Sequence, residues 1–356
     1  MREQIINIAR GLPQEALRVS IGEIAADYET NEMIFKAPTV TVLAVPKTPW
    51  AIGVDNIETP FAPDYDEEEY RANPSLTMMG LFEIRNMLRA FSVPVSKQTD
   101  YQEAPLLDRR FLVVGTGPGR EVVALSTLGA TVTGFDATKA YVDLTAKKVQ
   151  QASDKLGKKL TVSLYQCPAE DYSYEQSSYD GVTSLFGVLN HVEDWKGTIN
   201  KISESLKPEG KFVFSMYGTN DALVFKKIKT KELPYSPSIL QRRATGGILL
   251  GESEEILPTN FPSPLEIVQT LQEVGLIIEK ERGYLRIAAL FPKNPTSENL
   301  VAYRQMVEST DTAAAKAING YAKPEELLLS AFLYDQHNQV NIEDFAYVSY
   351  IARKRK

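Results

Sequence analysis

The sequence of 356 residues has very few of the residues that most often build metal sites and disulfides. A single cysteine, Cys167, excludes an intramolecular disulfide and a cysteine-rich zinc site. The histidines number only two, His191 and His337, which excludes a three-histidine metal site. We therefore expect no dedicated metal site, and only a magnesium site made of carboxylates stays open. The near absence of cysteine is typical of a reducing compartment.

Long apolar runs and an excess of basic residues are also missing. No run approaches the roughly 18 apolar residues of a membrane-spanning helix, and the first residues lack the apolar stretch of a signal peptide. Lys and Arg number 39 against 46 Asp and Glu, which gives a net charge of -7. Binding to a nucleic-acid backbone needs a basic face, which these totals do not supply. We expect a cytoplasmic protein that binds neither membrane nor nucleic acid.

The composition is otherwise that of a globular protein, with 43% hydrophobic and 24% charged residues. Between residues 106 and 217, apolar runs alternate with helical patterns. The expected strands are Phe111–Val114, Thr131–Phe135, Leu160–Tyr165, Gly181–Phe186 and Lys211–Met216. This alternation predicts an α/β fold, in which a parallel sheet is covered by helices on both faces.

The flanking segments predict additions around this core. We expect an N-terminal extension or cap over residues 1–105, with a helix at Arg2–Ala9, a strand-like run at Thr39–Val45 and a helix at Ser75–Phe91. Pro46, Pro49 and Pro60 are expected to break the chain after the strand-like run. Further along, we expect an insertion at 218–262, a core helix and strand at 263–290, a helical insertion at 291–341, and the last core strand with a basic tail at 342–356.

The strongest signal for a ligand is the glycine motif FLVVGTGPGRE at residues 111–121. Gly115, Gly117 and Gly119 follow an expected strand, and glycines there allow a tight turn and close approach of a ligand to the backbone. Asp136 lies 17 residues beyond Gly119, at the tip of the next strand, where an acid can accept both hydroxyls of a ribose. The dinucleotide motif would place a glycine at position 120, which is Arg120 here. The spacing therefore indicates an adenosine-containing ligand other than NAD.

Four segments resemble the class I S-adenosylmethionine-dependent methyltransferases, and the small-molecule branch most. They are VVGTGPGRE, GFDAT, CPAEDYSYEQSSYDGV and LKPEGKFVFS, and the resemblance covers residues 108–217, 263–288 and 343–354. It implies a Rossmann-like, doubly wound sheet of seven strands whose last strand is antiparallel. It also implies S-adenosylmethionine as the cofactor.

The resemblance further implies which residues surround the cofactor. The glycine loop would hold its methionine part, the end of the second strand its ribose, and the loop after the third strand its adenine. In that last loop Pro168 stands where many relatives have an acid, so Glu170, Asp171 or a backbone group could bind the adenine instead, and we assign Ala169 and Glu170. The end of the fourth strand would lie beneath the methyl group. The residues so assigned are Gly115, Thr116, Gly117, Gly119, Asp136, Ala137, Ala169, Glu170, Leu185, Phe186 and Gly187.

Two further residues are candidates for catalysis. His191 is a possible general base for an oxygen or nitrogen nucleophile, since histidine titrates near neutral pH. The alternative is a structural histidine that orders its loop. Tyr217, just past the fifth strand, could face the substrate or simply be part of the packing.

The function predicted is transfer of a methyl group by in-line displacement to an oxygen or nitrogen atom of a small molecule, for example in secondary metabolism, with S-adenosylhomocysteine as product. One alternative is a protein or peptide methyltransferase, whose acidic segment 55–69 would hold a basic peptide. Another is a non-catalytic scaffold that binds S-adenosylmethionine. The additions around the core are expected to cap the substrate or to form a homodimer.

Overall fold

The computed structural model describes residues 37–61, 74–93, 104–218, 247–249, 256–284, 288, 291–292, 295–339 and 345–356. The helix expected at Arg2–Ala9, much of the acidic segment and most of the insertion 218–262 lie outside the described residues.

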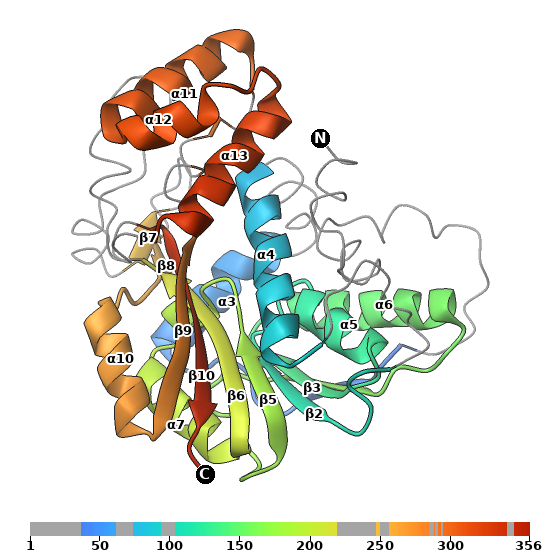
Figure 1. Ribbon diagram of the computed structural model, residues 1–356. Coiled ribbons are helices and arrows are strands. Elements are labelled where there is room, and N and C mark those ends of the chain that lie inside the picture. Colours follow the sequence, from blue (N-terminus) through green and yellow to red (C-terminus); the bar gives the residue numbers. More distant parts are fainter. Residues whose placement is uncertain are drawn as a thin grey trace.

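The described chain is built on an eight-stranded sheet with the order β1-β4-β3-β2-β5-β6-β10-β9 (Figure 1). β10 is antiparallel to both of its neighbours, and all other neighbouring pairs are parallel. The predicted doubly wound sheet with an antiparallel last strand is therefore confirmed. The strands are β1 (Val40–Val42), β2 (Arg110–Val114), β3 (Thr131–Asp136), β4 (Val162–Gln166), β5 (Tyr179–Ser184), β6 (Leu206–Tyr217), β9 (Leu276–Tyr284) and β10 (Tyr347–Lys354).

The strand count of seven was wrong by one, because the N-terminal extension adds β1 to the edge of the sheet. β1 runs parallel to β4, with Val40 opposite Leu164 and Val42 opposite Gln166. The run Thr39–Val45 has a strand-like composition, but composition carries no information about the strand with which it pairs.

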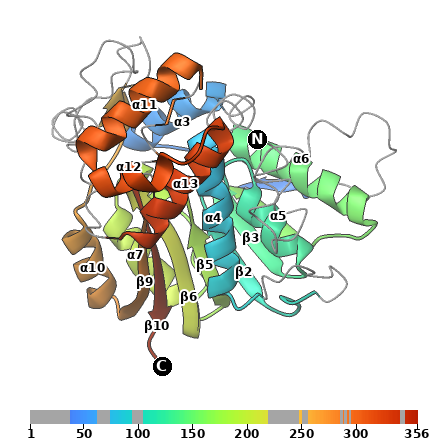
Figure 2. The ribbon, with the colours of Figure 1, turned by 45° about the horizontal axis from the view of Figure 1, so that its top comes forward.

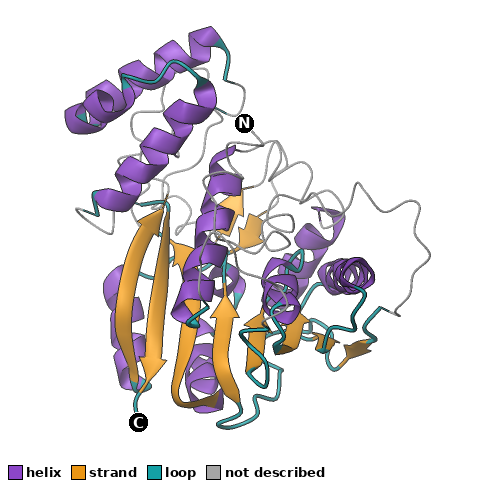
Figure 3. Cartoon of the chain, turned by 45° about the vertical axis from the view of Figure 1, so that its right-hand side comes forward, coloured by secondary structure: helices purple, strands orange, loops and turns teal. Residues whose placement is uncertain are grey.

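Helices cover both faces of the sheet (Figures 1 and 3). α4 (Pro74–Ala90), α5 (Arg120–Thr127) and α6 (Lys139–Leu156) pack on one face, and α7 (Trp195–Ser205) and α10 (Pro264–Glu273) on the other. The central strand β2 needs helices on both faces, because all its apolar side chains are buried. Phe111 and Val113 belong to the first core cluster, and Leu112 and Val114 to the second. A parallel strand buried on both faces reads as a continuous apolar run.

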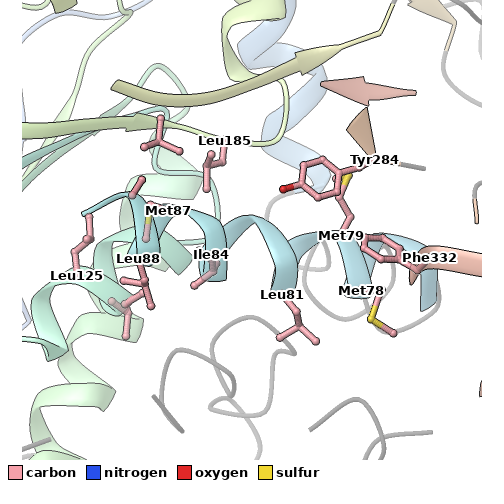
Figure 4. Close-up of a cluster of buried hydrophobic side chains, with 14 of the residues drawn as sticks. Met78, Met79, Leu81, Ile84, Met87, Leu88, Leu125, Leu185, Tyr284 and Phe332 are labelled. Atoms are coloured by element: carbon pink, nitrogen blue, oxygen red, sulfur yellow. The ribbon is translucent and has the colours of Figure 1, made fainter. Parts of the chain in front are cut away.

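α4 packs against both the core and the helical insertion. Figure 4 shows Met87 and Leu88 at one end of the helix near Leu125, and Met78 and Met79 at the other end near Tyr284 and Phe332. Phe332 belongs to α13 (Pro324–His337), which with α11 (Ser297–Thr310) and α12 (Thr312–Ile318) forms the helical insertion before β10. In Figures 1 and 2 these helices lie beyond the carboxyl ends of the parallel strands. No helix in the described part of the chain is long and apolar enough to cross a membrane.

The prolines were expected to break the chain after residue 45, and this expectation was wrong for residues 49–61. Residues Pro49–Phe61 form the helix α3. Pro49 occupies the first helical position, where no backbone N–H is needed for the helix and the fixed φ of proline suits it. α3 lies against β8 (Ile256–Pro258), which pairs with β7 (Gly247–Leu249) in a small second sheet, and also contacts α6.

Candidate cofactor-binding and active site

A cavity that is partly open to solvent lies at the carboxyl ends of the parallel strands. Its wall comes from the ends of β2, β3, β5 and β6, from the loop after β4 and from α3. The order of the strands along the chain reverses between β2 and β5, so the cavity lies at the switch point of the sheet. Open α/β sheets bind their ligands in this crevice.

Gly115 and Gly117 shape the cavity where β2 leads into α5. Gly115 has a φ of 73°, and a Cβ at this position would overlap the side chain of Val188. Gly117 has a φ of 45°, and a Cβ there would meet no atom within 4 Å. This part of the loop therefore leaves open space in which a ligand can approach the backbone closely.

Asp136 ends β3, and backbone amides hold both of its carboxylate oxygens. The Gly117 N–H donates to Oδ2 and the Thr138 N–H donates to Oδ1, each at 2.9 Å. Burial raises the pKa of Asp136 to about 6 although these two bonds lower it, and the negative charges of Glu58 and Asp55 raise it further. Each oxygen keeps a lone pair, so the fixed carboxylate can accept two further hydrogen bonds, as a ribose requires.

His191 and Tyr217 form a hydrogen-bonded pair in the cavity wall. The Tyr217 hydroxyl lies 3.1 Å from His191 Nε2, and the Pro258 carbonyl oxygen lies 3.0 Å from Nδ1. Because a carbonyl oxygen only accepts, Nδ1 carries the proton and Nε2 accepts the hydrogen bond of the tyrosine. Burial lowers the pKa of His191, which favours this neutral form. In this neutral form the lone pair of His191 Nε2 faces the Tyr217 hydroxyl.

Asn190 fixes the elements that carry this pair. The side chain is fully buried, its Oδ1 accepts the Tyr217 N–H at 2.9 Å, and its Nδ2 donates to the Asn260 carbonyl at 2.7 Å. The side-chain amide of Asn260 in turn donates to the Val192 carbonyl at 2.7 Å. These bonds hold the short 3-10 helix η4 (Val188–His191), the end of β6 and the residues after β8 together.

Buried ionisable side chains lie beside the cavity, where β2 and β5 end. Arg120 and Glu121 begin α5 and line the cavity, and the Arg120 guanidinium lies 5.0 Å from the centre of the Phe186 ring. Burial raises the pKa of Glu121 to about 7. On α4, burial and the nearby charge of Glu121 raise the pKa of Glu83 to about 8. Neither carboxyl oxygen of Glu83 makes a hydrogen bond of good geometry to a described residue, and the nearby Ser215 hydroxyl and Phe186 N–H lower its pKa less than burial raises it.

The helix α3 contributes Val54 and Glu58 to the cavity wall. Glu58 Oε2 accepts the hydroxyl of Tyr141, which belongs to α6, at 2.6 Å. Trp50 Nε1 donates to the His191 carbonyl at 2.8 Å. Because α3 is bonded to both α6 and η4, the N-terminal extension is a structural part of the candidate site.

Most of the residues predicted to bind the cofactor or act in catalysis come together around this cavity. Those that line it are Gly115, Thr116, Gly117, Asp136, Ala137, Ala169, Leu185, Phe186, His191 and Tyr217.

Gly119, Glu170 and Gly187 do not line the cavity. Gly119 caps α5, and Glu170 accepts the Asp194 N–H at 3.3 Å. Gly187 lies against the ring of Tyr217, since a Cβ there would come within 2.8 Å of Cε1. For these three residues, as for the ten that line the cavity, a role in binding the cofactor or in catalysis stays a prediction.

Sequence reasoning missed several cavity residues. Arg120 and Glu121 are the last two residues of the glycine motif, so their position was visible in the sequence, although their burial was not. Val54, Glu58 and Tyr141 reach the cavity only through the docking of α3 on α6, which no local pattern predicts. Within the described ranges, no three His, Cys, Asp or Glu side chains are grouped to hold a metal ion.

Residues 112–214 match a family model described as a methyltransferase domain. The chain is 30% identical over 122 residues to a ubiquinone/menaquinone biosynthesis C-methyltransferase of Geotalea daltonii, which is 33% of this chain and 50% of that protein. It is 30% identical over 115 residues to a ubiquinone biosynthesis O-methyltransferase of Actinobacillus pleuropneumoniae, which is 31% of this chain and 46% of that protein. The chain thus spans about half the length of the curated relatives that it matches.

The chain is also similar to solved structures, at lower identity. The 1,6-didemethyltoxoflavin-N1-methyltransferase of Burkholderia thailandensis, with 1,6-didemethyltoxoflavin and S-adenosylhomocysteine bound, aligns with a TM-score of 0.45 at 13% identity. The alignment covers 90% of this chain and 94% of that chain. The matched family region, 112–214, contains both the glycine loop and Asp136.

Proposed function

Residues 112–214 form a methyltransferase domain of the class I S-adenosylmethionine-dependent superfamily, and from this premise we propose that the chain is a methyltransferase enzyme. It transfers a methyl group to an oxygen or nitrogen atom of a small-molecule acceptor and leaves S-adenosylhomocysteine as product. The observation that carries the proposal is the Asp136 carboxylate, fixed by two backbone amides at the edge of a cavity that begins at the glycine loop. The names of the curated relatives, which refer to the biosynthesis of ubiquinone and menaquinone, support a small-molecule acceptor.

The residues of the cavity fit this cofactor. The open space beside Gly117 admits a ligand close to the backbone, and Asp136 offers acceptors for ribose hydroxyls. Phe135 and Leu185 give the cavity an apolar wall suited to a flat base and an alkyl chain. When bound, S-adenosylmethionine supplies a methyl group that is already activated by its attachment to a sulfonium sulfur.

The protein's part in the reaction is then to orient the acceptor, exclude water and remove a proton. Alignment of two reactants in a closed site can account for about 7–11 kcal/mol of the barrier. As the methyl group is transferred, an acceptor O–H or N–H gives its proton to the Tyr217 oxygen, and Tyr217 passes its own proton to His191 Nε2. Nδ1 keeps its proton on the Pro258 carbonyl throughout, which orients the imidazole. A base of this kind adds roughly 10²–10⁴-fold to the rate.

The additions around the core are proposed to bind the acceptor. Phe261, at the end of the insertion 218–262, lies 6.1 Å from the ring centre of Tyr217, and Tyr347 lies 4.9 Å from it. These two rings pack against Tyr217, which lines the cavity together with Val54 of α3. An acceptor with an aromatic or otherwise apolar body suits such a surface.

Calorimetric titration with S-adenosylmethionine and S-adenosylhomocysteine tests the cofactor assignment. We expect micromolar binding by the wild type and at least a tenfold loss in an Asp136→Ala variant, because two ribose hydrogen bonds to a charged group are removed. Asp143→Ala on the exposed surface of α6 is the matched control and should bind as the wild type does. No binding of either ligand by the wild type would refute the proposal.

Turnover tests the rest of the proposal. Incubation with methyl-labelled cofactor should label compounds in small-molecule extracts and not proteins. With an acceptor in hand, His191→Asn and Tyr217→Phe should each lower kcat by roughly 10²–10⁴-fold with little change in cofactor affinity. Labelling of protein alone would contradict the small-molecule assignment, and unchanged kcat in both variants would contradict the proton path.

A further inference from the structure

Glu58 is a cavity residue that the core of the domain does not supply. It comes from α3, in the N-terminal extension, and lines the same cavity as Asp136 and His191. One of its oxygens accepts the Tyr141 hydroxyl at 2.6 Å, which holds the carboxylate above the core. Its negative charge raises the pKa of both Asp136 and His191, so its field reaches both of these sides of the cavity.

The charges around the cavity are unbalanced. The acids that line it are Glu58, Glu121 and Asp136, whereas Arg120 is the one Lys or Arg among the described lining residues. Asp136 is held by backbone amides, and Glu121 is almost fully buried at the start of α5. Glu58 is half-buried, lines the cavity from α3 and is held through one oxygen by the Tyr141 hydroxyl, so its charge acts directly on a ligand in the cavity.

We propose that Glu58 is a specificity residue that makes the cavity prefer the cationic cofactor over its neutral product. This inference rests on the proposed function. S-adenosylmethionine carries a sulfonium charge that S-adenosylhomocysteine lacks, while the two share the ribose, the base and the amino-acid end. A carboxylate in a half-buried cavity attracts the charged sulfonium form and gains nothing comparable from a thioether. The preference of Glu58 for the cationic ligand favours exchange of the product for a new molecule of cofactor after each methyl transfer.

The test is equilibrium binding of three ligands to the full chain. S-adenosylmethionine and sinefungin, in which an amine replaces the methylated sulfur, are cationic at the tested position, and S-adenosylhomocysteine is neutral there. In Glu58→Gln we expect affinity for the two cationic ligands to fall roughly fivefold to twentyfold, and affinity for the neutral ligand to change less than twofold. Tyr141→Phe removes the hydrogen bond and keeps the charge, so it should retain the preference for the cationic ligands.

Salt dependence gives a second readout that does not depend on the shape of the side chain. Raising the salt concentration from about 0.05 M to 0.5 M should weaken binding of S-adenosylmethionine more in the wild type than in Glu58→Gln, because the attraction to the carboxylate is screened. A circular-dichroism melt checks that the variant is folded.

The outcomes separate this inference from the proposed function. Equal loss of all three ligands in Glu58→Gln, or no loss of any, overturns the role of Glu58 and leaves the methyltransferase assignment intact. Failure of the wild type to bind any of the three overturns both. A loss confined to the two cationic ligands, together with the reduced salt dependence, supports the assignment.

Discussion

Replacement of Glu83 by glutamine should make the protein more stable at neutral and alkaline pH. The Glu83 side chain is 1% exposed on α4, and burial raises its pKa from 4.5 to about 8. Between these two pH values the unfolded chain has an ionised Glu83, whereas the folded chain keeps it protonated. Folding therefore takes up a proton, and the free energy of unfolding must fall as the pH rises from 4.5 to 8.

The size of the effect follows from the pKa difference. Each pH unit in this interval corresponds to about 1.4 kcal/mol, so the wild type should lose up to ~4 kcal/mol between pH 5 and pH 8 through this one side chain. Glu83→Gln has nearly the same shape and does not titrate, so it lacks this loss. Titrating groups that do not interact with Glu83 are present in both proteins and cancel in the difference, whereas the charge of Glu121 contributes to the Glu83 pKa and is part of the effect.

Urea unfolding followed by tryptophan fluorescence and circular dichroism at pH 5, 6, 7 and 8 measures this difference. The gap between Glu83→Gln and the wild type should widen steadily with pH, while the slopes of the urea transitions stay equal. Glu308→Gln, on the exposed side of α11, is the control and should run parallel to the wild type. A constant gap between Glu83→Gln and the wild type across the four pH values would refute the reasoning.

Three further predictions concern the cavity and its supports. Gly115→Ala should unfold at lower temperature than Gly157→Ala, since both have a positive φ but only the Cβ at position 115 overlaps Val188; equal melting temperatures would contradict this. Asn190→Ala should lower the free energy of unfolding by roughly 2–4 kcal/mol in urea titrations, because buried main-chain groups lose their partners. A loss below about 1 kcal/mol would contradict this role of Asn190. Binding of S-adenosylhomocysteine should weaken about tenfold per pH unit below the Asp136 pKa of about 6, because a protonated carboxyl accepts ribose hydroxyls poorly. Calorimetry that shows the same affinity from pH 5 to 7 would contradict the role of the Asp136 carboxylate.

The core of the fold could be predicted because its signals are local. Buried parallel strands such as Phe111–Val114 are continuous apolar runs, and the glycine motif must stand where β2 turns into α5. The acid at position 136 is placed by the length of one helix and one strand. These features depend on neighbours within about twenty residues, which a sequence displays directly.

The rest of the site depends on contacts between distant segments. The prolines around α3 suggested a broken chain, yet Pro49 starts a helix, and only its docking brings Trp50 and Glu58 to the cavity. β1 joins the sheet by pairing with β4, more than a hundred residues away. Burial is equally invisible in composition, which is why the protonated state of Glu83 required the structure.

The way α3 is held also sets the order in which the site can be assembled as the chain folds. Trp50 bonds to the carbonyl of His191, 141 residues later, and His191 bonds in turn to the carbonyl of Pro258, a further 67 residues along. During synthesis α3 leaves the ribosome long before its partners in η4 and β8 are made. Contacts of such long sequence separation form late, because the loops between them must close first. A chain in which only the central strands have formed therefore has the glycine loop but not the complete cavity. A ligand that needs the complete cavity can stabilise the chain only after α3 has docked.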